Sequence, residues 1–160
     1  MAARQPRAMV LGVTGGLSLA LAVRSVERLP AWADNRAFLL TLLADHPESY
    51  RAQQSAAAVL AGIGDRAGAR RAFATADSLF GGDPHCKAEY AFFVLGQGDT
   101  AIAARLSRAA RAILARERVA LRVDFGLERL RGHPARAAAI ADTAVRWFPS
   151  ERPWYGAISP

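Results

Sequence analysis

Glycine recurs in this sequence at a fixed interval. Gly64-Asp65 is followed by Gly98-Asp99 and then, after an equal step, by Gly132-His133. Small residues keep the same interval at two other positions, as Ala69, Ala103 and Ala137 and as Ala76, Ala110 and Ala144. An interval that holds at three positions in three copies is typical of an array of repeated supersecondary units.

The residues of each copy predict a pair of helices joined by a glycine turn. Alanine and arginine, both good helix formers, dominate the chain, and strand-favouring runs are scarce, so we expect an all-α fold. Ala69 and Ala76 share a helix face, being two helical turns apart, and small side chains there let a second helix come close. Gly64 favours the left-handed turn that ends a helix. Asp65, and Asp99 or Thr100 in the second copy, can cap the next helix.

This spacing and these residues resemble the tetratricopeptide repeat, a helix–turn–helix unit of about 34 residues. The resemblance implies repeats at 50–83, 84–117 and 118–151. It places Gly64, Gly98 and Gly132 at the turns, and the third repeat also has the family's proline, at Pro149. The sequence departs from the family pattern at several positions, for example with Ser107 where the first repeat has Phe73.

Residues 31–47 continue the register toward the N-terminus, because Pro47 precedes Pro149 by three intervals. We expect them to form a leading half-repeat, so that the repeat domain covers 29–151 and residues 152–160 form a C-terminal tail. This junction also resembles the C-terminal tail of bacterial membrane proteins similar to transmembrane and tetratricopeptide repeat-containing mannosyltransferases. The residues that match are Trp32, Asn35, His46, Pro47, Ser49, Tyr50 and Arg51.

Residues 8–23 form an uncharged run behind Arg4 and Arg7, and Arg24 ends it. We expect residues 1–28 to be a signal anchor or transmembrane segment, or a signal cleaved near Ala22. The run is slightly shorter than the usual spanning range of about 17–25 residues. The basic flank predicts that the repeats lie outside the cytoplasm, at a bacterial inner membrane or exported from it.

The sequence indicates no enzyme. LAGIGDRAGARRAF, which begins at Leu60, lacks the ending of a phosphate-binding loop and follows no strand. His85-Cys86 has no third metal ligand nearby, and we predict no metal and no cofactor. The net charge of +7 comes from scattered arginines, and regular base-reading positions are lacking, so we do not expect a nucleic-acid partner.

The resemblance implies a binding groove on the first helix of each repeat. Its positions in this chain are Arg51, Gln54, His85, Phe92, Leu95, Arg122 and Arg129. We predict a non-catalytic scaffold that binds a protein or an extended peptide, with arginines suited to an acidic group. The alternative is the repeat region of a multi-span glycosyltransferase-like membrane protein, where it would position acceptor proteins.

Overall fold

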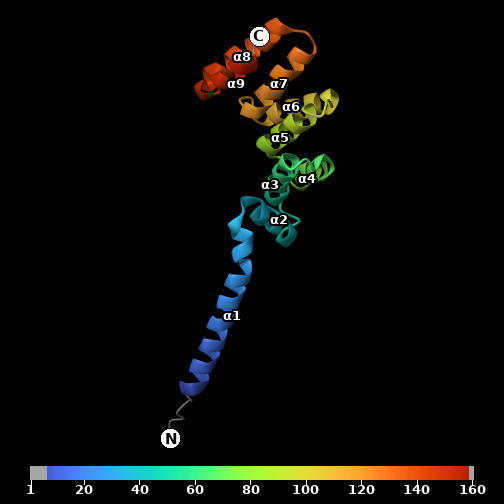
Figure 1. The fold of residues 1–160 in the computed structure, drawn as a ribbon. Helices are drawn as coiled ribbons and strands as arrows, with labels where there is room; N and C mark the ends of the chain where they lie inside the picture. The colour runs from blue at the N-terminus through green and yellow to red at the C-terminus, as the bar shows by residue number, and fades with distance from the viewer. Residues whose placement is uncertain (1–6, 159–160) are drawn as a thin grey trace. The chain divides into compact units, whose positions relative to one another are not determined.

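The computed structural model describes residues 7–158, except the side chains of residues 7–12, 14, 28–33, 35, 36, 157 and 158. All regular elements in this range are helical and no strand occurs in it, which confirms the all-α prediction (Figure 1). The chain divides into two compact units, Met1–Asp45 and His46–Pro160. The second unit contains all three copies of the repeat interval.

The first unit holds two helices that contact each other, α1 (Arg7–Ala33) and α2 (Asn35–Asp45). The expected leading half-repeat at 31–47 is therefore divided between these two helices, because the helix is interrupted at Asp34. Its residues 31–45 belong to the first unit, and His46 and Pro47 belong to the second. The side chains of Trp32 and Asn35, which carry part of the junction resemblance, lie outside the described residues.

The predicted transmembrane segment at residues 8–23 lies within α1. Among the described residues, no helix combines the length and the apolar character that crossing a membrane requires. The side chains of residues 8–12 and 14 of this run lie outside the described residues.

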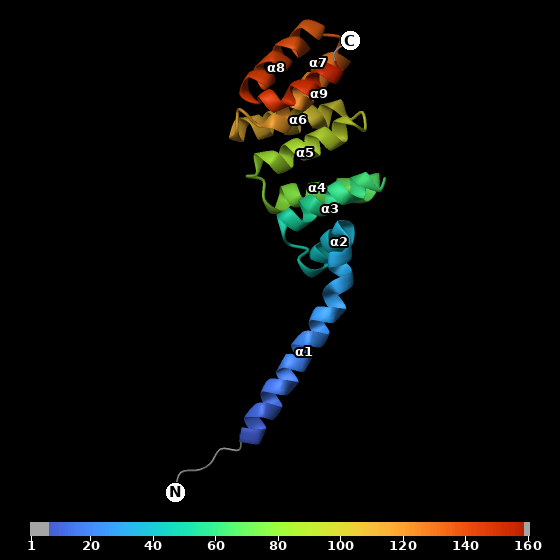
Figure 2. The same ribbon diagram turned by 60° about the vertical axis from the view of Figure 1, so that its left-hand side comes forward.

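The second unit is a succession of three helical hairpins, each made of a first and a second helix (Figure 2). The first helices are α3 (Tyr50–Gly62), α5 (Pro84–Leu95) and α7 (Arg118–Leu130). The second helices are α4 (Arg66–Leu79), α6 (Thr100–Ile113) and α8 (Pro134–Trp147). The helices pair within each hairpin, and α5 also contacts α4 and α7, so neighbouring hairpins pack in chain order.

The turn inside each hairpin has the backbone conformation that glycine favours. Gly64, Gly98 and Gly132 have φ angles of 85°, 84° and 75°, and no other described residue has a positive φ. Residues with a Cβ rarely adopt this region. The prediction that these glycines end the first helices in left-handed turns is confirmed.

The helix caps follow the same interval. Asp65 and Asp99 accept hydrogen bonds from the backbone N–H groups of Gly68 and Ile102, as predicted for the second helices. Ser49, Asp83 and Glu117 do the same for the first helices. Each bond satisfies a backbone donor that the helix itself leaves without a partner.

The periodic alanines of the second helices are buried. Ala69, Ala76, Ala103 and Ala110 are completely buried, and Ala137 and Ala144 are at most 2% exposed. Side chains of this size allow two helix backbones to come close, as the shared helix face predicts. All six periodic alanines are therefore buried, and their part in the close approach of the paired helices stays a prediction.

The C-terminal tail is more ordered than its proline and glycine suggest. A 3-10 turn η1 (Pro149–Glu151) leads into a short helix α9 (Arg152–Ile158). Tyr155 is buried, and its ring lies 5.1 Å from that of Phe125 and 4.8 Å from that of Trp154. The tail thus covers apolar side chains of α7 and α8.

We predict that Gly98→Ala lowers the free energy of unfolding by about 1–2 kcal/mol, because φ of 84° is unfavourable for an L-residue. The added Cβ meets no atom within 4 Å, so the backbone alone causes the loss. Gly62→Ala is the control: it also has open space but no positive φ, and it should stabilise the chain by about 0.4–1 kcal/mol. Urea unfolding measures both, and equal effects of the two variants would contradict the turn assignment.

We predict that Ala103→Leu lowers the free energy of unfolding by about 1–3 kcal/mol, because Ala103 is fully buried between α5 and α6. Ala101→Leu adds the same side chain at an exposed position of the same helix and should change stability by less than about 0.5 kcal/mol. The comparison is made by urea unfolding of both variants. A neutral Ala103→Leu would show that α6 does not approach α5 through this residue.

Candidate functional site

The seven residues predicted to line a binding groove all lie on the first helices α3, α5 and α7. Four of them are exposed: Arg51, His85, Phe92 and Arg129. The other three, Gln54, Leu95 and Arg122, are partly buried. The first helices therefore present these residues on the surface of the second unit, although several of the polar ones already bind neighbouring side chains.

A polar ladder of Gln54, His85, Glu89 and Glu117 links the first helices to one another. The Gln54 Nε2 donates to Glu89 Oε2 over 3.0 Å, from α3 to α5. The two ring nitrogens of His85 lie 3.3 Å from Glu89 Oε1 and 3.1 Å from Glu117 Oε1. Glu117 is buried and also accepts from the N–H of Ala120. His85 thus fixes the start of α7 and is not a free binding group.

Arg122 is held at the C-terminal end of the unit. Its Nε donates to Glu151 Oε2 over 2.6 Å, and its guanidinium lies 5.0 Å from the ring centre of Trp154. Glu151 is 4% exposed and also lies 3.5 Å from the guanidinium of Arg118. A carboxylate this deeply buried requires such partners. Arg122 therefore supports the fold of the tail.

Arg51 and Arg129 make fewer contacts with neighbouring side chains than Arg122 does. The Arg51 Nε donates to the hydroxyl of Tyr50 over 3.0 Å, and Arg129 lies over the ring of Phe125 at 5.8 Å. Both side chains are exposed, and neither makes a salt bridge within the described part of the chain. Each guanidinium carries five N–H donors, so both retain donors for a ligand.

Phe92 stands out among the first-helix residues because a large apolar ring is left 43% exposed. The residues at the same repeat position are Ala58 and Gly126, both small. A Cβ on Gly126 would lie 3.0 Å from Leu95 Cδ2, so Leu95 of α5 packs closely on α7 there. On both flanking helices, the residue at the position equivalent to Phe92 therefore has a small side chain or none.

The two junctions between hairpins use different chemistry at one repeat position. Between α4 and α5, the rings of Phe73 and Tyr90 stack with centres 5.5 Å apart. Between α6 and α7, the residues one repeat later are Ser107 and Asp124, and the buried Ser107 hydroxyl donates to Asp124 Oδ1 over 2.6 Å. Arg111 donates to the other oxygen of Asp124 over 2.7 Å. A hydrogen-bonded network therefore replaces an aromatic stack.

Two carboxylates outside the ladder have depressed pKa values. The hydrogen bond from Arg70, joined by one from the N–H of Ile102, holds the pKa of Asp99 below its usual range. Hydrogen bonds from His133 and then Arg131 lower the pKa of Glu128. Lowered carboxylate pKa values stabilise the fold above the unfolded-state pKa, and this contribution is lost as the pH falls through the folded-state value.

Cys86 is 1% exposed, and burial raises the pKa of its thiol to about 12. It lies beside His85, whose ring nitrogens both face carboxylates. Within the described residues, no group of three or more histidine, cysteine, aspartate or glutamate side chains is arranged to hold a metal ion. Cys86 has the environment of a packed core residue rather than of a nucleophile.

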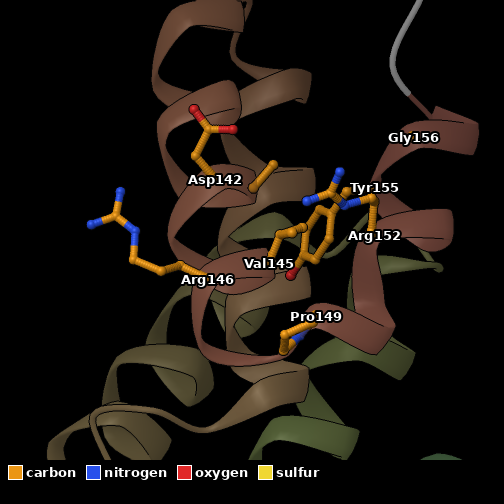
Figure 3. A pocket seen from close by; sticks show the side chains of 8 residues that line it. Asp142, Val145, Arg146, Pro149, Arg152, Tyr155 and Gly156 are labelled. Carbon is orange, nitrogen blue, oxygen red and sulfur yellow. The ribbon is translucent and has the colours of Figure 1, made fainter.

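A separate hollow of about 690 Å³ lies between α8 and the tail (Figure 3). Its wall includes Val145, Pro149 and Tyr155, with Asp142 and Arg152 at its edge, while Arg146 points away from the tyrosine ring. Burial raises the pKa of Tyr155 to about 12, so the phenol stays protonated. The hollow is open, and the sequence analysis singled out none of its polar residues.

The sequence analysis missed the acidic partners of the first helices, which are Glu89, Glu117 and Glu151. A signal for two of them was present, because Ser49, Asp83, Glu117 and Glu151 follow one another at the repeat interval. Three of these four residues cap first helices in the structure. Glu89 has no such periodic counterpart, and only the packing of α3 near α5 reveals it.

Comparison of the sequence with protein-family models gives no match, and comparison with curated proteins gives none either. Function is therefore inferred from the geometry of the described residues.

We predict that Cys86 of the folded chain reacts at least about 100-fold more slowly with iodoacetamide at pH 8.5 than Cys86 of the chain in guanidinium chloride. The thiolate is the reactive form, and a thiol with a pKa of about 12 is almost fully protonated at this pH. Mass spectrometry of time points measures both rates. Equal rates would show that the α5 helix does not bury this residue.

Proposed function

We propose that the second unit is a tetratricopeptide array and that it binds a protein segment along the exposed side of α3, α5 and α7. Three hairpins in register, positive-φ glycines at one position and buried alanines at two others support this assignment. Arrays of this kind bind ligands along an extended surface formed by successive repeats. The chain would then act as a scaffold rather than as an enzyme.

The observation that carries the proposal is the exposed ring of Phe92 at the middle of the three first helices. A large apolar ring loses free energy when it leaves water and is a typical anchor at protein interfaces. The small side chains at the equivalent positions, Ala58 and Gly126, leave room for a partner's side chain beside the ring. The polar ladder around it holds the first helices in fixed positions.

The arginines define the chemistry of the segment. Arg122 is already bound to Glu151, so it contributes little to a ligand. Arg51 on α3 and Arg129 on α7 are exposed on the helices that flank α5. The segment that fits best has an apolar residue for Phe92 and acidic residues on either side of it.

We predict that Phe92→Ala weakens binding of a selected peptide by roughly 30-fold, the size expected for an interface anchor. Peptides are selected from a random phage-displayed library on the full chain and are measured by fluorescence anisotropy. Phe80→Ala is the matched control, because Phe80 is a similarly exposed ring at the end of a second helix.

Circular dichroism confirms that both variants keep their helicity. Equal binding by the wild type and Phe92→Ala, or an equal loss in Phe80→Ala, would contradict the assignment of this face.

A further inference from the structure

The arginines of the second unit are divided unevenly between its two sets of helices. The second helices carry the majority, and the exposed ones are Arg66 and Arg71 on α4, Arg105 and Arg108 on α6, and Arg136 and Arg146 on α8. Arg71 and Arg105 occupy the same repeat position in successive copies. Each of the three second helices thus carries two exposed arginines.

The acidic residues are distributed in the opposite way. The buried glutamates of the polar ladder and of the tail neutralise the first-helix side, as the contacts of His85 and Arg122 show. Within the second helices the acids are Asp77, which is bound to Lys87, and Asp142. Asp65 and Asp99 cap α4 and α6, and Asp99 is bound to Arg70. Within the described residues, Arg71, Arg105 and Arg108 form no salt bridge, although, after the hydrogen bond from Arg70, the charge of Arg105 also contributes to lowering the pKa of Asp99. Exposed arginines without a salt bridge are therefore present on α4 and α6, the helices that do not carry the proposed peptide-binding residues.

The side chains between these arginines are small. The exposed residues that accompany them on α4 and α6 include alanines at 67, 74, 101 and 112. No exposed aromatic ring lies between the arginines to stack on a nucleotide base, and no asparagine or glutamine is present on α4 or α6 to read a base edge. Such a surface can bind phosphate groups, but it has no side chain of these kinds to recognise a nucleotide base.

The first unit contains a helix with many exposed apolar side chains. In α1, the side chains of Val13, Leu17, Leu19, Leu21, Val23 and Val26 are 50–67% exposed. A run of exposed apolar side chains favours the interfacial region of a bilayer, and reversible membrane binding is strengthened when an apolar element and a basic patch occur in one chain. Nucleic acid offers no comparable environment for α1.

We propose that the arginine side of α4 and α6, centred on Arg71, Arg105 and Arg108, binds the phosphate headgroups of an anionic lipid bilayer. Guanidinium groups bind phosphate oxygens with paired N–H donors, and an anionic surface attracts each basic residue near it. The proposed peptide face remains accessible because it lies on the other set of helices. This contact is independent of whether the first helices bind a peptide.

The test compares the full chain with two triple variants in co-sedimentation with vesicles of phosphatidylcholine alone or with 30% phosphatidylglycerol, about one third anionic lipid. One variant is Arg71→Gln, Arg105→Gln, Arg108→Gln. The control, with the same net charge, is Arg51→Gln, Arg116→Gln, Arg129→Gln, which changes exposed arginines that do not belong to α4 or α6. A basic residue contributes about fivefold to partitioning, so the first variant should bind anionic vesicles on the order of 100-fold more weakly.

We expect the control variant to bind anionic vesicles like the wild type, and the wild type to bind them more tightly than neutral vesicles. Arg71→Lys, Arg105→Lys, Arg108→Lys should retain binding, because the attraction depends on charge; circular dichroism reports whether each variant is folded. Equal losses in both glutamine variants, or equal binding to neutral and anionic vesicles, would overturn the proposal. Tighter binding to duplex RNA than to vesicles, lost only in the first variant, would assign the surface to nucleic acid instead.

Discussion

The close contact of two helices through alanine is the constraint on which the rest of the second unit depends. At Ala69, Ala76, Ala103 and Ala110 no exposed surface remains. Because the paired helices come this near, the connection between them must turn within a few residues, and the glycine with positive φ makes that turn possible. The hairpin geometry then sets where the next first helix starts, and with it the register of every later contact.

The path of the backbone in the second unit follows from the sequence because it depends on local residues with few alternatives. Gly64, Gly98 and the capping aspartates each act on their own segment, so their spacing predicts turns and helix starts without knowledge of the packing. The short tail helix α9 was not predicted, since Pro153 and Gly156 disfavour it locally. Its stability comes from burying Tyr155 against Phe125, a contact between residues distant in the sequence.

The sequence predicted which helices carry the candidate site residues, but not which of their polar groups are already bonded to neighbours. The repeat register places Arg51, His85, Phe92 and Arg122 on the first helices, and the structure agrees. Whether a polar side chain is available to a ligand depends on its neighbours, and those come from other repeats. His85 faces Glu117 and Arg122 faces Glu151, in each case far along the chain. No local pattern shows that such groups are already occupied, whereas Phe92 is left exposed because its periodic neighbours are small.

The two junctions between hairpins differ, with Phe73 against Tyr90 at one and Ser107 against Asp124 at the other. This difference affects which hairpins can pack together during folding. If the hairpins were interchangeable, a chain with one repeated interval could pair the wrong copies or exchange a hairpin with another molecule. A ring placed against Asp124, or Tyr90 against the small hydroxyl of Ser107, would leave a buried charge or an empty space. The different residues at the two junctions thus distinguish them from each other. The hairpins can therefore pack in one order although their sequences are similar.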